Sequence, residues 1–98
     1  MTSPFSVRGT PRFDRLLRKL TRKHPDLSER FAEAFVILST DPYNSSGSYP
    51  IRKLRGVGQG EGQYRLRSGQ WRFRYDVRGR EVELNYCGLR REDTYRPS

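Results

Sequence analysis

The stretch that decides the fold reads Gln63-Tyr-Arg-Leu-Arg-Ser-Gly-Gln-Trp-Arg-Phe-Arg-Tyr-Asp-Val-Arg-Gly-Arg-Glu-Val-Glu-Leu-Asn-Tyr-Cys87. Apolar and polar residues alternate along it in three runs, which is the period of a half-buried β-strand. Ser68-Gly69 and Arg78-Gly79 separate the runs where two-residue hairpin turns would lie, and glycine tolerates the positive φ that such turns need. The stretch therefore predicts a three-stranded antiparallel meander.

Placing these two dipeptides at the hairpin tips predicts the register. Leu66 then lies opposite Trp71, and Arg65 lies opposite Arg72. The two hairpins, aligned independently, put their apolar residues on one face, which supports the register because a one-residue slip would reverse the faces. The apolar face comprises Tyr64, Leu66, Trp71, Phe73, Tyr75, Val82, Leu84 and Tyr86. The polar face comprises Arg65, Arg67, Arg72, Arg74, Asp76, Glu81, Glu83, Asn85 and Cys87.

The polar face carries the clue to function. Arg65 opposite Arg72 is a like-charge cross-strand pair, which is destabilising, and Arg67 lies close to it. Only Arg74 has an acidic residue directly across, in Glu83. Such repulsion is tolerated where an anion binds, so the pattern favours a phosphate-binding face over a merely solvated basic face.

Composition points to a polyanionic partner. The chain has 98 residues, enough for a single domain spanning 1–98, with a net charge of +9. Between residues 51 and 80 there are nine lysines and arginines against two acidic residues. A basic field on one face attracts nucleic acid or an acidic protein.

The same inventory excludes several other classes. The single cysteine, Cys87, rules out an intramolecular disulfide and a cysteine-based metal site, and no histidine lies near it to make it a nucleophile. No apolar run approaches the roughly 20 residues of a membrane span, and the N-terminus lacks a signal-peptide core. We therefore expect a cytoplasmic protein that needs no metal or cofactor.

Two helices are expected in the N-terminal half, after a short edge strand over Phe5–Arg8. Thr10 and Pro11 suit the cap and first position of a helix that stops before Pro25. Its apolar stripe is Phe13, Leu16, Leu17 and Leu20. A second helix runs from Asp26, with Glu29 as capping-box partner, to near Thr40. Its stripe is Phe31, Ala34, Phe35 and Leu38, and His24 lies in the turn as a surface or capping residue.

Loops are expected between this helical pair and the meander. Residues 43–50 read as loop, 51–56 as a short basic segment, and 57–62 as a mobile glycine-rich loop without the features of a Walker loop. The predicted fold is α+β with the order β-α-α-β-β-β. Both helices pack on one face of a small antiparallel sheet, and the basic face stays open. Trp71 should be buried, and so should Phe35 among the helical residues that cover it.

With this layout, the sequence resembles the RelE/ParE toxin superfamily of bacterial toxin–antitoxin systems. The matching segments are Lys53-Leu-Arg-Gly56, Tyr64-Arg-Leu-Arg-Ser-Gly-Gln-Trp-Arg72, Arg74-Tyr-Asp-Val77 and Gly88-Leu-Arg-Arg91 through Tyr95, with the helical pair in the family's position. The resemblance covers nearly the whole chain.

The resemblance implies a ribosome-dependent endoribonuclease that cuts mRNA without a metal. In RelE-type members the ribose 2′-OH attacks the adjacent phosphate and leaves a cyclic phosphate and a free 5′-OH. Carried onto this sequence, the catalytic positions are Arg65, Arg67, Arg72, Arg90 or Arg91, and Tyr95. Further basic residues, Arg52, Lys53, Arg55 and Arg74, are expected to contact RNA.

One departure bears on the chemistry, because RelE has lysines where this chain has Arg65 and Arg67. Arginine keeps the charge and binds phosphate through two nitrogens, but it does not accept a proton near pH 7. Tyr95 is then the nearest candidate acid or base, and Glu61 is a second one.

The resemblance also leaves two alternatives open. One is a ParE-like inhibitor that binds DNA gyrase without chemistry of its own, and the other is a catalytically inactive nucleic-acid-binding domain of the same fold. The expected partners are a cognate antitoxin, mRNA and the ribosome, with no membrane. The chain is expected to be a monomer when free of antitoxin, and an acidic antitoxin segment would cover the helices or the arginines.

Overall fold

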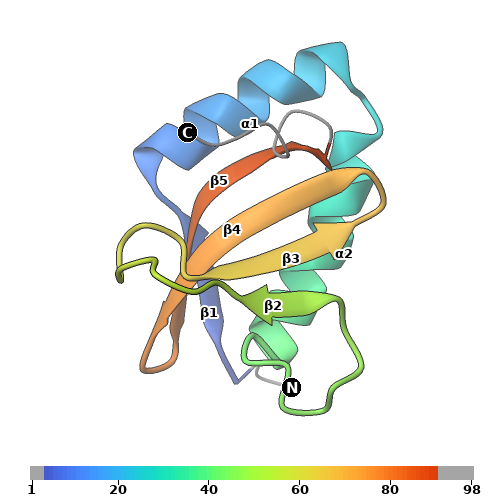
Figure 1. Cartoon of the computed structure of the whole chain (residues 1–98). Helices are drawn as coiled ribbons and strands as arrows, with labels where there is room; N and C mark the ends of the chain where they lie inside the picture. The colour runs from blue at the N-terminus through green and yellow to red at the C-terminus, as the bar shows by residue number, and fades with distance from the viewer. Residues whose placement is uncertain (1–3, 91–98) are drawn as a thin grey trace.

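A computed structural model of the chain describes residues 4–90, which form the expected α+β fold (Figure 1). Its elements are β1 (Ser6–Gly9), α1 (Pro11–Lys23), α2 (Leu27–Thr40), β2 (Ile51–Lys53), β3 (Tyr64–Ser68), β4 (Trp71–Arg78) and β5 (Glu81–Leu89). The predicted order is confirmed, with β2 as an added strand in the segment that the sequence marked only as basic.

The strands form one sheet in the order β1-β5-β4-β3-β2. The sheet is mixed and not wholly antiparallel as expected, because β1 runs parallel to β5. Alternation along a short segment shows that it is a strand but does not show the direction in which it pairs.

Both helices begin and end close to where the sequence predicts. Thr10 caps α1, accepting a hydrogen bond of 3.0 Å from the N–H of Phe13, and Pro11 occupies the first turn. His24 follows as the C-cap residue, ahead of Pro25. The expected capping box at Asp26 is absent, since the Asp26 side chain makes no cap hydrogen bond and instead accepts one from a strand residue described below.

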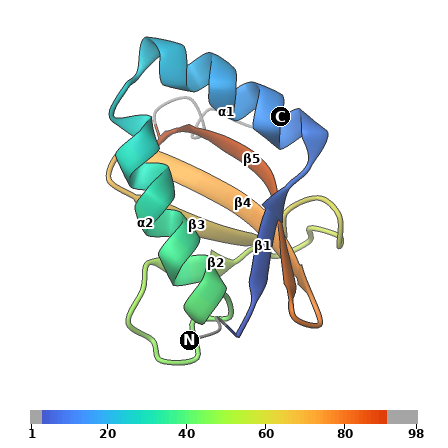
Figure 2. The same ribbon diagram turned by 180° about the vertical axis from the view of Figure 1, so that it is seen from behind.

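The helices cover one face of the sheet, as Figure 2 shows from behind. The core between the layers is formed by Phe13, Leu27, Ala34, Leu38, Leu66, Trp71, Phe73, Tyr75, Val77, Val82, Leu84 and Cys87. Trp71 is only 1% exposed, as predicted, whereas Phe35 is 43% exposed and its predicted burial is wrong. Leu27, Ala34 and Leu38 are the core residues of α2. The run Phe35-Val-Ile-Leu38 is apolar at four successive positions, so it does not reveal which side of the helix faces the sheet.

The register differs from the predicted one by two positions in each hairpin. The loops are Gly69-Gln70 and Gly79-Arg80, so Leu66 lies opposite Phe73 and Arg65 lies opposite Arg74. Both glycines have positive φ, 63° and 59°, and occupy the first loop position, where a type II′ turn needs glycine. Because the pairing moved by an even number of residues, these side chains stay on their predicted faces.

A β-bulge between Arg74 and Tyr75 breaks this parity further along β4 and β5. Beyond it, Phe73 lies opposite Cys87 and Arg74 lies opposite Tyr86. The predicted sides of Cys87 and Tyr86 are therefore both wrong, because one extra residue exchanges the two faces of the strand that follows. Cys87 is buried in the core, and its burial raises the pKa of the thiol to about 12, which makes it unreactive.

Candidate nucleic-acid interface

The sheet face away from the helices carries rows of arginines, which we call the arginine face: Arg52, Arg65, Arg67, Arg72 and Arg74. One row crosses four strands and contains Arg52, Arg65, Arg74 and Tyr86. The next row contains Arg67, Arg72 and Gly88. The expected like-charge pairing is present, although its partners are Arg65 with Arg74 and Arg67 with Arg72.

The exposure of these arginines varies across the face. Arg72, on the central strand β4, is 8% exposed, whereas Arg67 directly opposite it is exposed. At the β2 edge, a pocket of about 120 Å³ is lined by Pro50, Ile51, Arg52, Arg65 and Arg67. Guanidinium groups carry fixed charge and present paired donors, so this edge suits a phosphate group.

Arg74 holds the glycine-rich loop through side-chain hydrogen bonds to its backbone. Its Nε and Nη2 donate hydrogen bonds of 3.2 and 3.0 Å to the carbonyl of Gly62, and Nη2 donates another of 3.1 Å to the carbonyl of Glu61. Arg74 therefore helps to hold the glycine-rich loop, and its expected contact with RNA stays a prediction.

Asp76, two residues after Arg74 on β4, holds the same loop from the same face of the sheet. Its buried carboxylate accepts hydrogen bonds from the N–H groups of Gly62 at 3.0 Å and Gln63 at 3.1 Å, and a further one from the Asn85 amide. Burial would raise the pKa of this carboxyl, but these donors outweigh it and lower the pKa below its ordinary value. The loop, expected to be mobile, is thus fastened to β4 at its C-terminal end.

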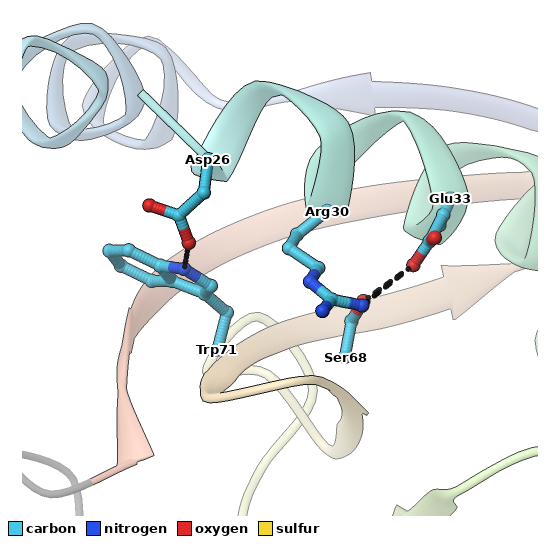
Figure 3. A network of polar contacts seen from close by, with 5 residues as sticks. All are labelled: Asp26, Arg30, Glu33, Ser68 and Trp71. Carbon is cyan, nitrogen blue, oxygen red and sulfur yellow. Dashed lines mark hydrogen bonds and ion pairs between the residues drawn. The ribbon is translucent and has the colours of Figure 1, made fainter. Parts of the chain in front are cut away.

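The hairpin of β3 and β4, which carries four of these arginines, is fixed to α2 on its other side (Figure 3). The indole Nε1 of Trp71 donates to Asp26 at 3.2 Å, and the Ser68 hydroxyl donates to Glu33 at 3.2 Å. Arg30 forms an ion pair of 3.3 Å with the same Glu33 oxygen. These contacts set the position of the hairpin, and therefore that of the arginine face, relative to the helices.

Three of the predicted catalytic residues lie on this face, and a fourth, Arg90, lies close to the end of the β3–β4 hairpin. Arg65, Arg67 and Arg72 lie together, and Arg90 follows β5 beside the β3–β4 turn, where its backbone N–H donates to the Gln70 carbonyl at 2.7 Å. The Arg90 residue is exposed. Two further predicted positions, Arg91 and Tyr95, lie outside the described residues.

The other residues that were predicted to contact RNA do not all lie on the arginine face. Arg52 lies in the row of Arg65, whereas Lys53 lies opposite Tyr64 on the helix side, with its Nζ 5.7 Å from the centre of the Tyr64 ring. Arg55 is exposed in the loop after β2. Glu61 is also exposed, and its carboxylate accepts a hydrogen bond from the N–H of Gly58. Lys53 is therefore not part of the arginine face.

One residue of this face was missed by the sequence reasoning. Tyr86 joins the row of Arg74 only because the bulge reverses its side. Gly88, two positions later, is the feature of the sequence that could have indicated the side of Tyr86. A residue without a side chain leaves room on a strand face for its neighbour.

The described residues offer neither a metal site nor a membrane-spanning helix. No three histidine, cysteine or acidic side chains gather into a potential metal site within residues 4–90. No helix in this part of the chain is long and apolar enough to cross a membrane.

Comparison with known proteins identifies the fold. No protein-family model and no curated protein matches the sequence. The structure is similar to a chain in the crystal structure of an archaeal RelE–RelB complex from Pyrococcus horikoshii OT3, with a TM-score of 0.64. The match covers 89% of this chain and 96% of that chain at 24% sequence identity. The chain thus has the RelE-type fold that the sequence resemblance implied.

Proposed function

We propose that this chain, which has the RelE-type fold, is the toxin of a toxin–antitoxin pair and cuts mRNA on the ribosome without a metal ion. The observation that carries the proposal is the pairing of arginines across adjacent strands on the sheet face away from the helices. Arg67 opposite Arg72 brings two guanidinium groups onto neighbouring strands, and such paired donors suit the binding of an RNA phosphate. A ribosomal target would place the protein in the cytoplasm.

In the proposed reaction the 2′ oxygen of a ribose forms a bond to the adjacent phosphorus, and the bond from phosphorus to the 5′ oxygen breaks. The 2′-OH proton passes to a base, and a proton is delivered to the leaving 5′ oxygen. The products are a 2′,3′-cyclic phosphate and a free 5′-OH. Negative charge accumulates on the phosphate oxygens between these events, and oriented cationic donors stabilise it there.

The arginines supply that stabilisation and do not move protons. We assign the reacting phosphate to Arg67 and Arg72, which lie opposite each other, with Arg65 in the neighbouring row and Arg90 directly after β5. A guanidinium cannot serve as a base near pH 7, so proton transfer needs another group. We assign this role to Tyr95, the near-terminal tyrosine that the sequence resemblance implies, which lies outside the described residues.

The proposed protein partner is an antitoxin with an acidic segment. The neighbouring structure is a RelE–RelB complex, which supports a protein partner for this fold. The net charge of +9 favours an acidic binder, and a segment laid across the arginine face would exclude RNA while bound.

The test is cleavage of a defined mRNA on programmed ribosomes by the purified chain. We expect cut products ending in a 2′,3′-cyclic phosphate, and about 100-fold slower cleavage by Arg67→Ala, the scale for losing one oriented donor. Arg67 is exposed, so its removal should leave the fold intact by circular dichroism. Arg18→Ala is the matched control, because it removes an exposed arginine from α1, and it should cleave at the parent rate.

Two outcomes would contradict the proposal. If the parent leaves ribosome-bound mRNA intact but blocks DNA supercoiling by gyrase, the chain is a gyrase inhibitor of the ParE kind. If Arg67→Ala cuts as fast as Arg18→Ala, the arginine face does not hold the reacting phosphate.

A further inference from the structure

Tyr86 lies on the arginine face for a reason that is specific to this backbone. The bulge at Arg74 and Tyr75 exchanges the two sides of the last part of β5, which sends Cys87 into the core and Tyr86 to the open side. A large aromatic residue thereby leaves the core and lies in the row of Arg65 and Arg74. It is half-buried there.

The Tyr86 side chain lies along its own strand and over Gly88. A methyl group placed on Gly88 would be 2.4 Å from the Tyr86 hydroxyl oxygen and 2.9 Å from the ring carbon that bears it. Gly88 does not have the positive φ that distinguishes several other glycines of the chain. It is therefore needed for the space that it leaves, and not for an unusual backbone conformation.

Because of this orientation, the Tyr86 hydroxyl lies over the row of Arg67 and Arg72, although the Tyr86 backbone belongs to the row of Arg65 and Arg74. Gly88 is the partner of Arg72 across the β4–β5 ladder, and Arg72 is the partner of Arg67 across β3–β4. The phenolic oxygen over Gly88 is therefore in line with the two arginines to which we assign the reacting phosphate. A phenol hydroxyl adds a short, directional O–H donor beside these charged groups.

From this placement we propose that the Tyr86 hydroxyl donates a hydrogen bond to a non-bridging oxygen of the RNA phosphate held by Arg67 and Arg72. The inference rests on the proposed function and adds a substrate-contacting residue to it. The hydroxyl acts as a hydrogen-bond donor that stabilises charge on the phosphate, so its role differs in kind from the proton transfer assigned to Tyr95. It acts with Gly88, which makes room for it.

The first test compares Tyr86→Phe with Tyr43→Phe in single-turnover cleavage on programmed ribosomes. Tyr86→Phe removes only the hydroxyl, and we expect a loss of about 100-fold, as for removal of one oxyanion donor. Tyr43 is an exposed phenol outside the arginine face, and its variant should match the parent. Circular dichroism should show that the parent and both variants are folded at the assay temperature, since the aromatic rings are kept.

A second readout separates contact with phosphate from a merely structural role. Sulfur at the contacted non-bridging oxygen is a weaker acceptor, so one phosphorothioate isomer should slow the parent. That sulfur effect should shrink in Tyr86→Phe, which has no hydroxyl to lose. A structural role would slow both substrates equally and leave the sulfur effect unchanged.

Gly88→Ala completes the experiment without altering the tyrosine. Its methyl group would displace the hydroxyl, so we expect a loss similar to that of Tyr86→Phe, with no further loss when the two changes are combined. Parent-like cleavage by Tyr86→Phe, or fully additive losses in the double variant, would overturn this inference and leave the arginine mechanism standing. A parent that does not cut would overturn the proposed function and this inference together.

Discussion

Asp76 is a buried carboxylate on the arginine face, and its burial is possible because hydrogen-bond donors surround it. Backbone N–H groups of Gly62 and Gln63 and the amide of Asn85 supply them. Alternation predicted correctly that Asp76 lies on the polar side, but its partners come from a loop 13 and 14 residues earlier in the chain. No local pattern could identify them.

Asp76 should make stability depend on pH in the acid range. Its pKa is lower in the folded chain than the ordinary 3.8, so the stabilisation is fully present above that value and is lost as pH falls through the folded pKa. Asp76→Asn should destabilise the fold by about 1–3 kcal/mol at pH 7, because the amide cannot satisfy the same donors. Urea unfolding at pH 7 and near pH 3 measures this.

The variant provides its own control, since the difference in stability between parent and Asp76→Asn should narrow at the lower pH. A gap that stays the same at both pH values would show that the carboxylate charge does not hold the loop.

At the scale of elements, the junction between the β3–β4 hairpin and α2 positions the arginine face. Trp71 lies against the His24 ring at 5.2 Å between centroids and donates to Asp26. The turn approaches α2 so closely that a methyl group on Gly69 would be 2.8 Å from the Nε of Arg30. The hairpin and the helix are therefore fitted to each other at this end of the sheet.

Removing the indole should be costly at this junction. Trp71 is 1% exposed, so Trp71→Ala should reduce the free energy of unfolding by about 3–5 kcal/mol through the lost burial and the cavity left behind. Denaturant unfolding followed by circular dichroism measures the loss. Val36→Ala, at a position 63% exposed on α2, is the control and should cost little. Similar losses for both variants would contradict the assigned packing.

The same elements show what the sequence could and could not predict. Strand alternation placed Leu66, Trp71 and Arg72 on the correct faces, because faces depend only on parity. The loop positions were off by one residue, since a glycine fits either place in a two-residue turn. The sides of Tyr86 and Cys87 were wrong, because a bulge depends on how two strands meet and leaves no periodic signal.

At the scale of the whole molecule, the two sides of the protein carry different kinds of positive charge. The α1 helix presents separate exposed basic residues, among them Arg12, Arg15, Arg18 and Lys19. The arginine face instead pairs its charges directly across strands. Attraction of a polyanion at long range involves both sides, but phosphate contact is expected only on the face.

The salt dependence of RNA binding distinguishes the arginine face from the basic residues of α1. If four arginines of the face each contact one phosphate of single-stranded RNA, log Kd should change with log salt with a slope of about 3 in magnitude. Arg67→Ala should reduce that slope by about 0.7, whereas Arg18→Ala should leave it unchanged. Anisotropy titrations of a short labelled RNA at several salt concentrations measure both. Equal reductions would place bound RNA on the helix side as well.

The junction at Trp71 also gives the chain an optical label of its own. Trp71 is the only tryptophan, and it is buried where the hairpin, the end of α1 and the start of α2 meet. The tryptophan fluorescence of this protein therefore comes from a single position. A change in the emission wavelength or lifetime of Trp71 fluorescence on adding an antitoxin or a ribosome would report a structural change at that junction, without any dye or engineered residue.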